Sequence, residues 1–238
     1  MGKVRKSNQD SIYLESNIPL YIVADGMGGH LGGDIASAMC VELIPAQIHE
    51  KLQDENPEKV LQESVAFTNR KIFEKSCSDE KLKGMGTTVV INYFHKTNLY
   101  VGNVGDSRAY LVNKNRLYQL SKDHSLIQEK INMGIYTREQ AQKDKMKNVL
   151  VRSVGFEESI EVDVFSYKIC KNDLFFICSD GLHGKVADSD IIQIINKNIA
   201  NPADATIEDL EKTVRELIEL AKENGGQDNI SLIMSIAK

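Results

Sequence analysis

The chain has 238 residues, of which 42% are hydrophobic and 26% charged, a composition typical of a globular protein that can bury a core. Its formal net charge of −5 argues against nucleic acid as a partner, because phosphate contacts require clustered lysine and arginine. No apolar run approaches the roughly 18 residues needed to cross a bilayer and no secretory signal is visible, so we expect no membrane association and a cytoplasmic location. The four cysteines form neither a CxxC pair nor a CxxxxxR loop, which argues against a thioredoxin-type site and a cysteine phosphatase.

Short runs rich in β-branched and aromatic residues predict the strands. Hairpin-length turns at 95–98 and 113–115 join neighbouring strands, which must then pair antiparallel, since a parallel crossover needs about a dozen residues or more. In chain order the predicted strands are 11–14, 20–24, 88–94, 99–104, 109–113, 116–120, 160–167, 173–179 and 229–236.

Two helices are predicted early in the chain and two late. Apolar residues three and four positions apart indicate the two amphipathic ones, and a Thr206–Asp209 capping box marks the start of the last. The expected ranges are 34–45 with a continuation to 52 beyond a kink, 61–72, 190–199 and 210–221. This order indicates an α+β fold in which helix pairs cover the outer faces of two packed antiparallel sheets.

The segment at about 123–152 fits neither the strand nor the helix period. It contains a short helical stretch at 125–134 and a second capping-box pair, Thr137 and Gln140. An excursion of this length between two strands is usually functional. We therefore expect residues 1–238 to form a single domain that carries a flap insertion at about 123–152.

A glycine-rich stretch, VADGMGGHLGGD, follows the second predicted strand. A dinucleotide-binding fingerprint would need a third glycine where Leu31 stands, and a P-loop would need a Lys-Ser/Thr pair that is absent. The stretch therefore does not match a known phosphate-cradling loop.

Five aspartates recur at the ends of predicted strands: Asp10, Asp25, Asp106, Asp180 and Asp228. Each alone fits an ordinary turn, but antiparallel neighbours can bring strand ends together at one edge, where carboxylates repel unless a cation lies between them. Oxygen ligands without histidine or cysteine favour Mg²⁺ or Mn²⁺. Arg5 could present its guanidinium to a phosphate at the same place, or could be a solvated residue of a basic N-terminus.

Nine motifs in order resemble the PPM or PP2C metal-dependent Ser/Thr protein phosphatases in their compact bacterial form. The resemblance covers nearly the whole chain and implies a four-layer α-β-β-α sandwich. The motifs are GKVRKSNQD (2–10), VADGMGGHLGGDIAS (23–37), GMGTTVV (84–90), VGNVGDSRAYL (101–111), LSKDHSLI (120–127), MGIYTREQA (133–141), LVRSVG (150–155), CSDGL (178–182) and GGQDNIS (225–231).

The resemblance also implies a metal centre. Asp25, the backbone carbonyl of Gly26, Asp180 and Asp228 would hold two catalytic Mg²⁺ or Mn²⁺ ions, and Asp106 would serve a third ion. A hydroxide bridging the two catalytic ions would attack phosphorus in line, without a phosphoenzyme.

Further roles follow from the same resemblance. Asp10 would hold metal-bound water, and Arg5 would bind the phosphate of the substrate. The expected partners are phosphorylated proteins, namely a Ser/Thr kinase and its substrates, and the expected oligomeric state is a monomer.

The sequence departs from the family pattern at four places. Met27 stands where animal members have a histidine proposed as the acid for the leaving group, and His30 is the nearest substitute. Gly184 replaces an acidic residue, and Lys145-Met146 replaces a His-Pro pair in the flap. The first motif begins at Gly2, so the usual leading strand is expected to be absent or truncated, with a sheet edge exposed.

Two alternative functions remain open from the sequence. A catalytically silent PP2C-fold module could bind a phosphorylated or regulatory partner, although such proteins tend to lose ligands and all five aspartates are present. A two-metal phosphodiesterase or nuclease is disfavoured by the acidic net charge.

Overall fold

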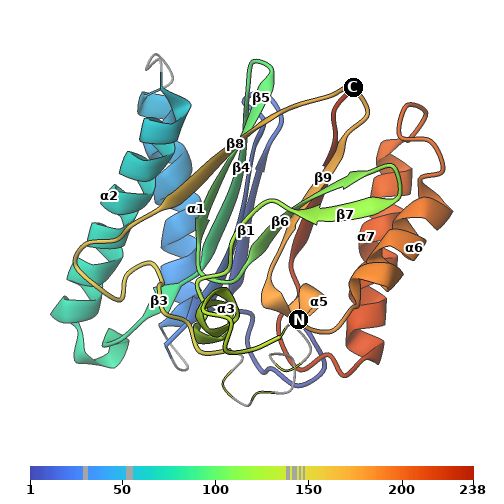
Figure 1. The fold of residues 1–238 in the computed structure, drawn as a ribbon. Helices are drawn as coiled ribbons and strands as arrows, with labels where there is room; N and C mark the ends of the chain where they lie inside the picture. The colour runs from blue at the N-terminus through green and yellow to red at the C-terminus, as the bar shows by residue number, and fades with distance from the viewer. Residues whose placement is uncertain (29–31, 52–55, 138–139, 141–143, 145, 147) are drawn as a thin grey trace.

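The computed structural model describes residues 1–238 except 29–31, 52–55, 138–139, 141–143, 145 and 147. Its elements lie in four layers, with a helix pair on each outer side and two antiparallel sheets between them (Figure 1). The predicted α-β-β-α sandwich of the α+β class is therefore confirmed.

The first sheet has six strands in the order β1-β2-β4-β5-β8, with β3 paired to β2. Its strands are β1 (Asp10–Glu15), β2 (Leu20–Met27), β3 (Gly86–Thr87), β4 (Val89–His95), β5 (Asn98–Val104) and β8 (Asp163–Lys168). As an edge strand, β1 leaves Ile12 54% and Leu14 59% exposed.

The second sheet has four strands in the order β10-β9-β6-β7. They are β6 (Arg108–Asn113), β7 (Arg116–Gln119), β9 (Leu174–Cys178) and β10 (Leu232–Ile236). Both predicted hairpin turns are present, and Lys114 and Asn115 in the β6–β7 turn have the positive φ angles that such a two-residue turn requires.

Two long helices cover each sheet (Figure 1): α1 (Gly33–Glu50) and α2 (Pro57–Ser78) on the first, α6 (Asp188–Asn198) and α7 (Ile207–Glu223) on the second. Three short helices complete the described elements, η1 (Glu80–Leu82), α3 (Leu126–Asn132) and α5 (Asp180–His183). No helix within the described ranges is long and apolar enough to cross a membrane.

Three apolar clusters hold the layers together. The first joins α1 and α2 to the first sheet, the second lies between the sheets around Phe175, and the third joins the second sheet to α6 and α7 around Leu217. All four positions of the predicted face of α2 are buried: Leu61, Val65, Thr68 and Ile72. Burial of such faces is the main source of stability of helices in a layered fold.

Most predicted boundaries are close to the observed ones. The capping box at Thr206 and Asp209 is present, and α1 continues through Pro45 to Glu50. Two strand predictions started too early, since β8 begins at Asp163 and β10 at Leu232. The residues before β10 instead bond to the N-terminal segment, as described below.

The flap lies between β7 and β8, and its base is closed by a bridge between Ser125 and Leu150. The Thr137 side chain accepts from the Gln140 N–H at 3.2 Å and the Gln140 side chain accepts from the Thr137 N–H at 2.9 Å, which confirms the predicted capping box. Several of the residues after it lie outside the described ranges.

Candidate active site

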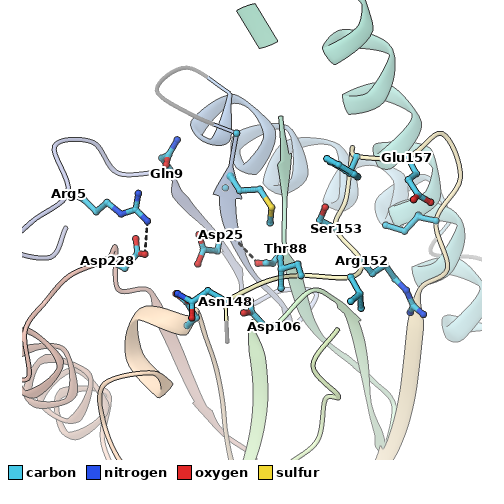
Figure 2. Close-up of a pocket in the computed structure, with 18 of the residues that line it drawn as sticks. Arg5, Gln9, Asp25, Thr88, Asp106, Asn148, Arg152, Ser153, Glu157 and Asp228 are labelled. Carbon is cyan, nitrogen blue, oxygen red and sulfur yellow. Dashed lines mark hydrogen bonds and ion pairs between the residues drawn. The ribbon is translucent and has the colours of Figure 1, made fainter. Parts of the chain in front are cut away.

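A cleft of about 1080 Å³ opens where the ends of both sheets meet the N-terminal segment and the residues after the flap. Six of the predicted site residues line it: Arg5, Asp25, Gly26, Asp106, Asp180 and Asp228. Figure 2 shows Asp25, Asp106 and Asp228 directed toward one region, with Arg5 beside Asp228. Asp10 does not line the cleft and is only 7% exposed. The aspartates that do line it are called the aspartate wall below.

Strand pairing sets the positions of Asp10 and Asp25. The two residues are directly opposite each other in the antiparallel β1–β2 pair, so their side chains share one face of the sheet. The Asp25 N–H donates to Thr88 Oγ1 at 3.1 Å, and the Thr88 N–H donates to the Asp25 carbonyl at 2.8 Å. The Ser179 hydroxyl donates to Asp10 Oδ2 at 2.9 Å, which ties the first sheet to the second.

Gly26 permits a close approach of backbones beside Asp25. Its N–H donates to the Gln9 carbonyl at 3.0 Å, and an added Cβ would overlap the Gly33 carbonyl oxygen at the start of α1. No residue with a side chain fits this position, so the glycine after Asp25 is a steric requirement.

Asp228 is positioned by the segment before β10 rather than by a strand. The Asn229 side chain accepts from the Gln9 N–H at 2.9 Å and donates to the Ser7 carbonyl at 3.1 Å, while its own N–H donates to Asp228 Oδ1 at 2.8 Å. Arg5 Nη2 donates to Asp228 Oδ2 at 2.8 Å (Figure 2). The N-terminal segment and this loop therefore hold each other in place.

Asp106 lies in the turn between β5 and β6, after Gly105, whose φ is +102°. His183 Nε2 donates to the Asp106 backbone carbonyl at 3.0 Å. Burial lowers the pKa of His183 to about 3, so the imidazole is neutral at pH 7 and carries one N–H for this bond. Asp180 itself begins α5, the short helix that ends at His183.

Burial and mutual repulsion raise the pKa of four of these carboxylates. Burial, followed by repulsion from Asp10, Asp180, Asp106 and Asp228, raises the pKa of Asp25 well above its usual value. Burial and neighbouring aspartates raise the pKa of Asp106 to about 7 and that of Asp180 to about 6. Burial likewise raises the pKa of Asp10. A cation between these groups would remove this cost.

The donor set suits a hard divalent cation. Asp10 Oδ1 and Asp180 Oδ1 are buried oxygens without a hydrogen-bond partner, and carboxylate and carbonyl oxygens are preferred by Mg²⁺ and Mn²⁺. Over the described residues, however, no three His, Cys, Asp or Glu side chains already form a group that could hold a metal ion. The electrostatics thus favour a cation here without defining its coordination geometry.

The remaining predicted positions fall into two groups. His30 and Lys145 lie outside the described residues. Met27 lines the cleft but carries no proton to donate, and Gly184 is the residue that caps α5, its N–H donating to the Asp180 carbonyl at 2.8 Å. The described part of the cleft therefore does not identify an acid for the leaving group.

Four residues that the sequence reasoning did not single out support the aspartates: Thr88, Ser179, His183 and Asn229. Two of them, Ser179 and Asn229, directly adjoin a predicted site aspartate, and His183 follows Asp180 by three positions. The available signal was a polar residue directly beside such an aspartate in the sequence.

The opposite wall of the cleft follows the flap. It includes Phe156, together with Arg152 and Glu157, which Figure 2 labels. The fully buried Asn69 of α2 fixes its backbone, accepting from the Gly155 N–H at 2.7 Å and donating to the carbonyls of Glu157 and Glu158 at 2.9 and 3.1 Å. Hydrogen bonds to α2 therefore hold the backbone of this wall in place.

Comparisons with known proteins agree with this geometry. Residues 3–231 match the family model described as protein phosphatase 2C. The chain is 35% identical to a serine/threonine phosphatase stp of Listeria welshimeri, over 98% of this chain and 91% of the relative. It is 30% identical to the protein phosphatase PhpP of Streptococcus pneumoniae, over 98% and 93%.

Solved structures show the same fold. The crystal structure of the Mycobacterium tuberculosis serine/threonine phosphatase PstP/Ppp matches with a TM-score of 0.84 and 29% identity, covering 100% of this chain and 95% of that one. The catalytic domain of a phosphatase PstP in complex with two manganese ions matches with a TM-score of 0.81 and 28% identity, covering 100% and 95%.

Proposed function

The chain belongs to the protein phosphatase 2C family and is a protein serine/threonine phosphatase, and from this premise we propose that it hydrolyses phosphoserine and phosphothreonine in a metal-dependent reaction at the aspartate wall of the cleft. The observation that carries the proposal is the convergence of carboxylates whose pKa values are raised by burial and mutual repulsion. Such a cluster is stable in its charged form only beside cations.

We assign the metal-holding residues from this cluster. Asp25, the carbonyl of Gly26, Asp180 and Asp228 would hold two ions, and Asp106 would serve a third. When bound, two divalent ions would supply an activated water as nucleophile and neutralise charge on the attacking and leaving oxygens. The two manganese ions in the related PstP structure support Mn²⁺ or Mg²⁺ in this role.

The chain's own residues would bind and orient the reactants. Arg5, already beside Asp228, would turn its free N–H donors to the phosphate. Asp10 would orient water from behind the wall. Cys40 and Cys178 are buried, and burial raises the pKa of both thiols, so neither is suited to form a phosphoenzyme.

We further propose that residues 1–238 act as one phosphatase domain with its flap at about 123–152. Its partners would be phosphorylated proteins, including a Ser/Thr kinase and the substrates of that kinase, and it would work as a monomer in the cytoplasm. All four cysteines are free, which suits a reducing compartment.

The test is hydrolysis of a phosphothreonine peptide by the purified full chain, first stripped with EDTA and then given Mn²⁺ or Mg²⁺. We expect no turnover after stripping and recovery with either ion. A folded, metal-loaded protein without turnover would indicate the silent binding module instead. Faster hydrolysis of bis-p-nitrophenyl phosphate than of the peptide would indicate a phosphodiesterase.

A further inference from the structure

The cleft extends beyond the aspartates to a second end, which carries Phe156 and Glu157. In Figure 2, Glu157 lies near α2, on the far side of the cleft from Arg5 and Asp228. A phosphorylated side chain at the aspartates would occupy only the first end. The second end is therefore available to another side chain of the same substrate.

The charges at this second end are mostly neutralised by one another. Arg152 donates to Asp163 at 2.8 Å and to Glu161 at 3.1 Å, so the positive charge of its guanidinium is already paired with carboxylates of the protein. Among the described residues, the Glu157 side chain forms no ion pair or hydrogen bond, and this exposed residue lines the cleft. The net charge offered to a ligand at this end is negative.

Phe156, the residue before Glu157 in the chain, adds an apolar surface to the lining of the cleft. Its side chain is 62% exposed although it lines the cleft, whereas large apolar side chains in this fold are otherwise mostly buried in the three clusters. An aromatic face beside a carboxylate suits a side chain with an apolar stem and a cationic end.

The wall is also preorganised. Asn69 fixes the backbone on both sides of Phe156, through Gly155 and through the carbonyls of Glu157 and Glu158. Gly155 has a φ of +89°, and an added Cβ would overlap the Ile72 side chain of α2. A fixed backbone lowers the entropy cost of holding a ligand there.

We propose that Phe156 and Glu157 form a subsite that binds an arginine or lysine of the phosphoprotein substrate, near the phosphorylated residue in sequence. This inference rests on the proposed function, because the phosphate must sit at the aspartates. The cation would lie over the Phe156 ring and beside the Glu157 carboxylate. A substrate acidic at the same position would be repelled.

The experiment measures kcat/KM on phosphothreonine peptides in which one arginine is placed in turn at each position up to about three residues on either side, roughly 10 Å of extended chain, in an alanine background. We expect one position to raise kcat/KM about three- to tenfold over the all-alanine peptide at low salt, and less at high salt.

The Glu157→Gln variant should lose most of this preference, and Glu157→Lys should prefer glutamate at the same position. Glu158→Gln is the matched control, since Glu158 is the neighbouring exposed glutamate but does not line the cleft, and it should keep the preference. Equal rates for all arginine placements, or a preference that survives Glu157→Gln, would overturn the subsite. Failure of the wild type to hydrolyse even the all-alanine peptide would instead count against the proposed function.

Discussion

Two sets of carboxylates near this cleft behave in opposite ways. For Asp163 on β8, burial alone would raise the pKa, but hydrogen bonds with His124 and with Arg152 outweigh it and lower the pKa. Burial is the largest cause that raises the pKa of Asp25, and repulsion from Asp10, Asp180 and other carboxylates adds to it. Burial acts to raise the pKa of both aspartates of the first sheet, but only Asp163 has hydrogen-bond partners that outweigh it.

The difference separates a charge that is satisfied within the protein from one that is not. We call the Asp163 group complete, because the Asp163 carboxylate is paired within the protein with Arg152 and His124 of the flap. We call the Asp25 group incomplete, because its carboxylates chiefly face one another. The free-energy cost of burying these charges together is recovered only when a cation binds. Most of the variants below alter one of the two sets, and Asn69→Ala alters the wall that follows the flap; the largest expected effect comes first.

The largest effect is expected for Asp180→Asn, which removes one charge from the incomplete set. Turnover of a phosphopeptide should fall at least about a hundredfold through loss of a metal ligand. The folded-state pKa of about 6 lies above the usual 3.8, so the charged form costs stability as pH rises through this window. The metal-free variant should therefore melt at a higher temperature than wild type at pH 7.

Asp204→Asn is the matched control for Asp180→Asn, because Asp204 is exposed and far along the chain from the cleft residues. It should change neither turnover nor melting. Near-normal turnover of Asp180→Asn in saturating Mn²⁺ would refute its role as a ligand.

Next in size is Asn69→Ala, which removes the support of the Phe156 wall. It leaves the Gly155 N–H and two carbonyls without their partner and should lower the free energy of unfolding by about 2–4 kcal/mol. Urea denaturation measures this change. Gln62→Ala, on the exposed face of the same helix, should cost far less, and equal costs for the two variants would contradict the structural role of Asn69.

Arg5→Ala removes the cation that pairs with Asp228, one of the aspartates of the incomplete set. Arg5 is half exposed, so its loss should affect stability little, but KM for the phosphopeptide should rise about five- to tenfold with a smaller change in kcat. Steady-state kinetics beside Lys3→Ala, a neighbouring exposed cation, provide the comparison. An unchanged KM would make Arg5 an ordinary surface residue.

The smallest effect concerns His124, in the complete set. Its Nδ1 accepts from the Gly105 N–H at 3.2 Å, and burial is the main cause that lowers its pKa from 6.5. The unfolded chain therefore binds a proton more readily, and stability is lost as pH falls below 6.5, by at most about 1.4 kcal/mol per pH unit.

His124→Asn can keep the acceptor without titrating. The unfolding free energy of wild type should therefore fall more between pH 7 and pH 5.5 than that of the variant, as measured by urea denaturation at both pH values. Parallel falls would show that His124 does not contribute to acid sensitivity.

Much of the fold could be predicted because its signals are local. Alternating and helical periodicities reflect which face of each element is buried, and the buried face of α2 matches its pattern. The aspartates could be grouped because antiparallel strands bring distant strand ends to one edge. Their roles came from the resemblance.

The remainder depends on contacts that leave no local pattern. Asn229 and Gln9 are 220 positions apart, and Asn69 and Gly155 are 86 apart, yet both pairs hold walls of the cleft. The start of β10 was misplaced because the sequence at 229–231 does not reveal that the Asn229 side chain bonds to the N-terminal segment. Only the tertiary structure shows which polar side chain fixes which loop.

The direct pairing of Asp10 with Asp25 also has a consequence for folding fidelity. Side chains alternate between faces along a strand, so a slip of one residue between β1 and β2 would send the two carboxylates to opposite faces of the sheet. A misregistered molecule would then lack a functional cation site even if its core were filled. Response to Mn²⁺ in a thermal melt can therefore serve as an assay for correct strand register in refolded protein.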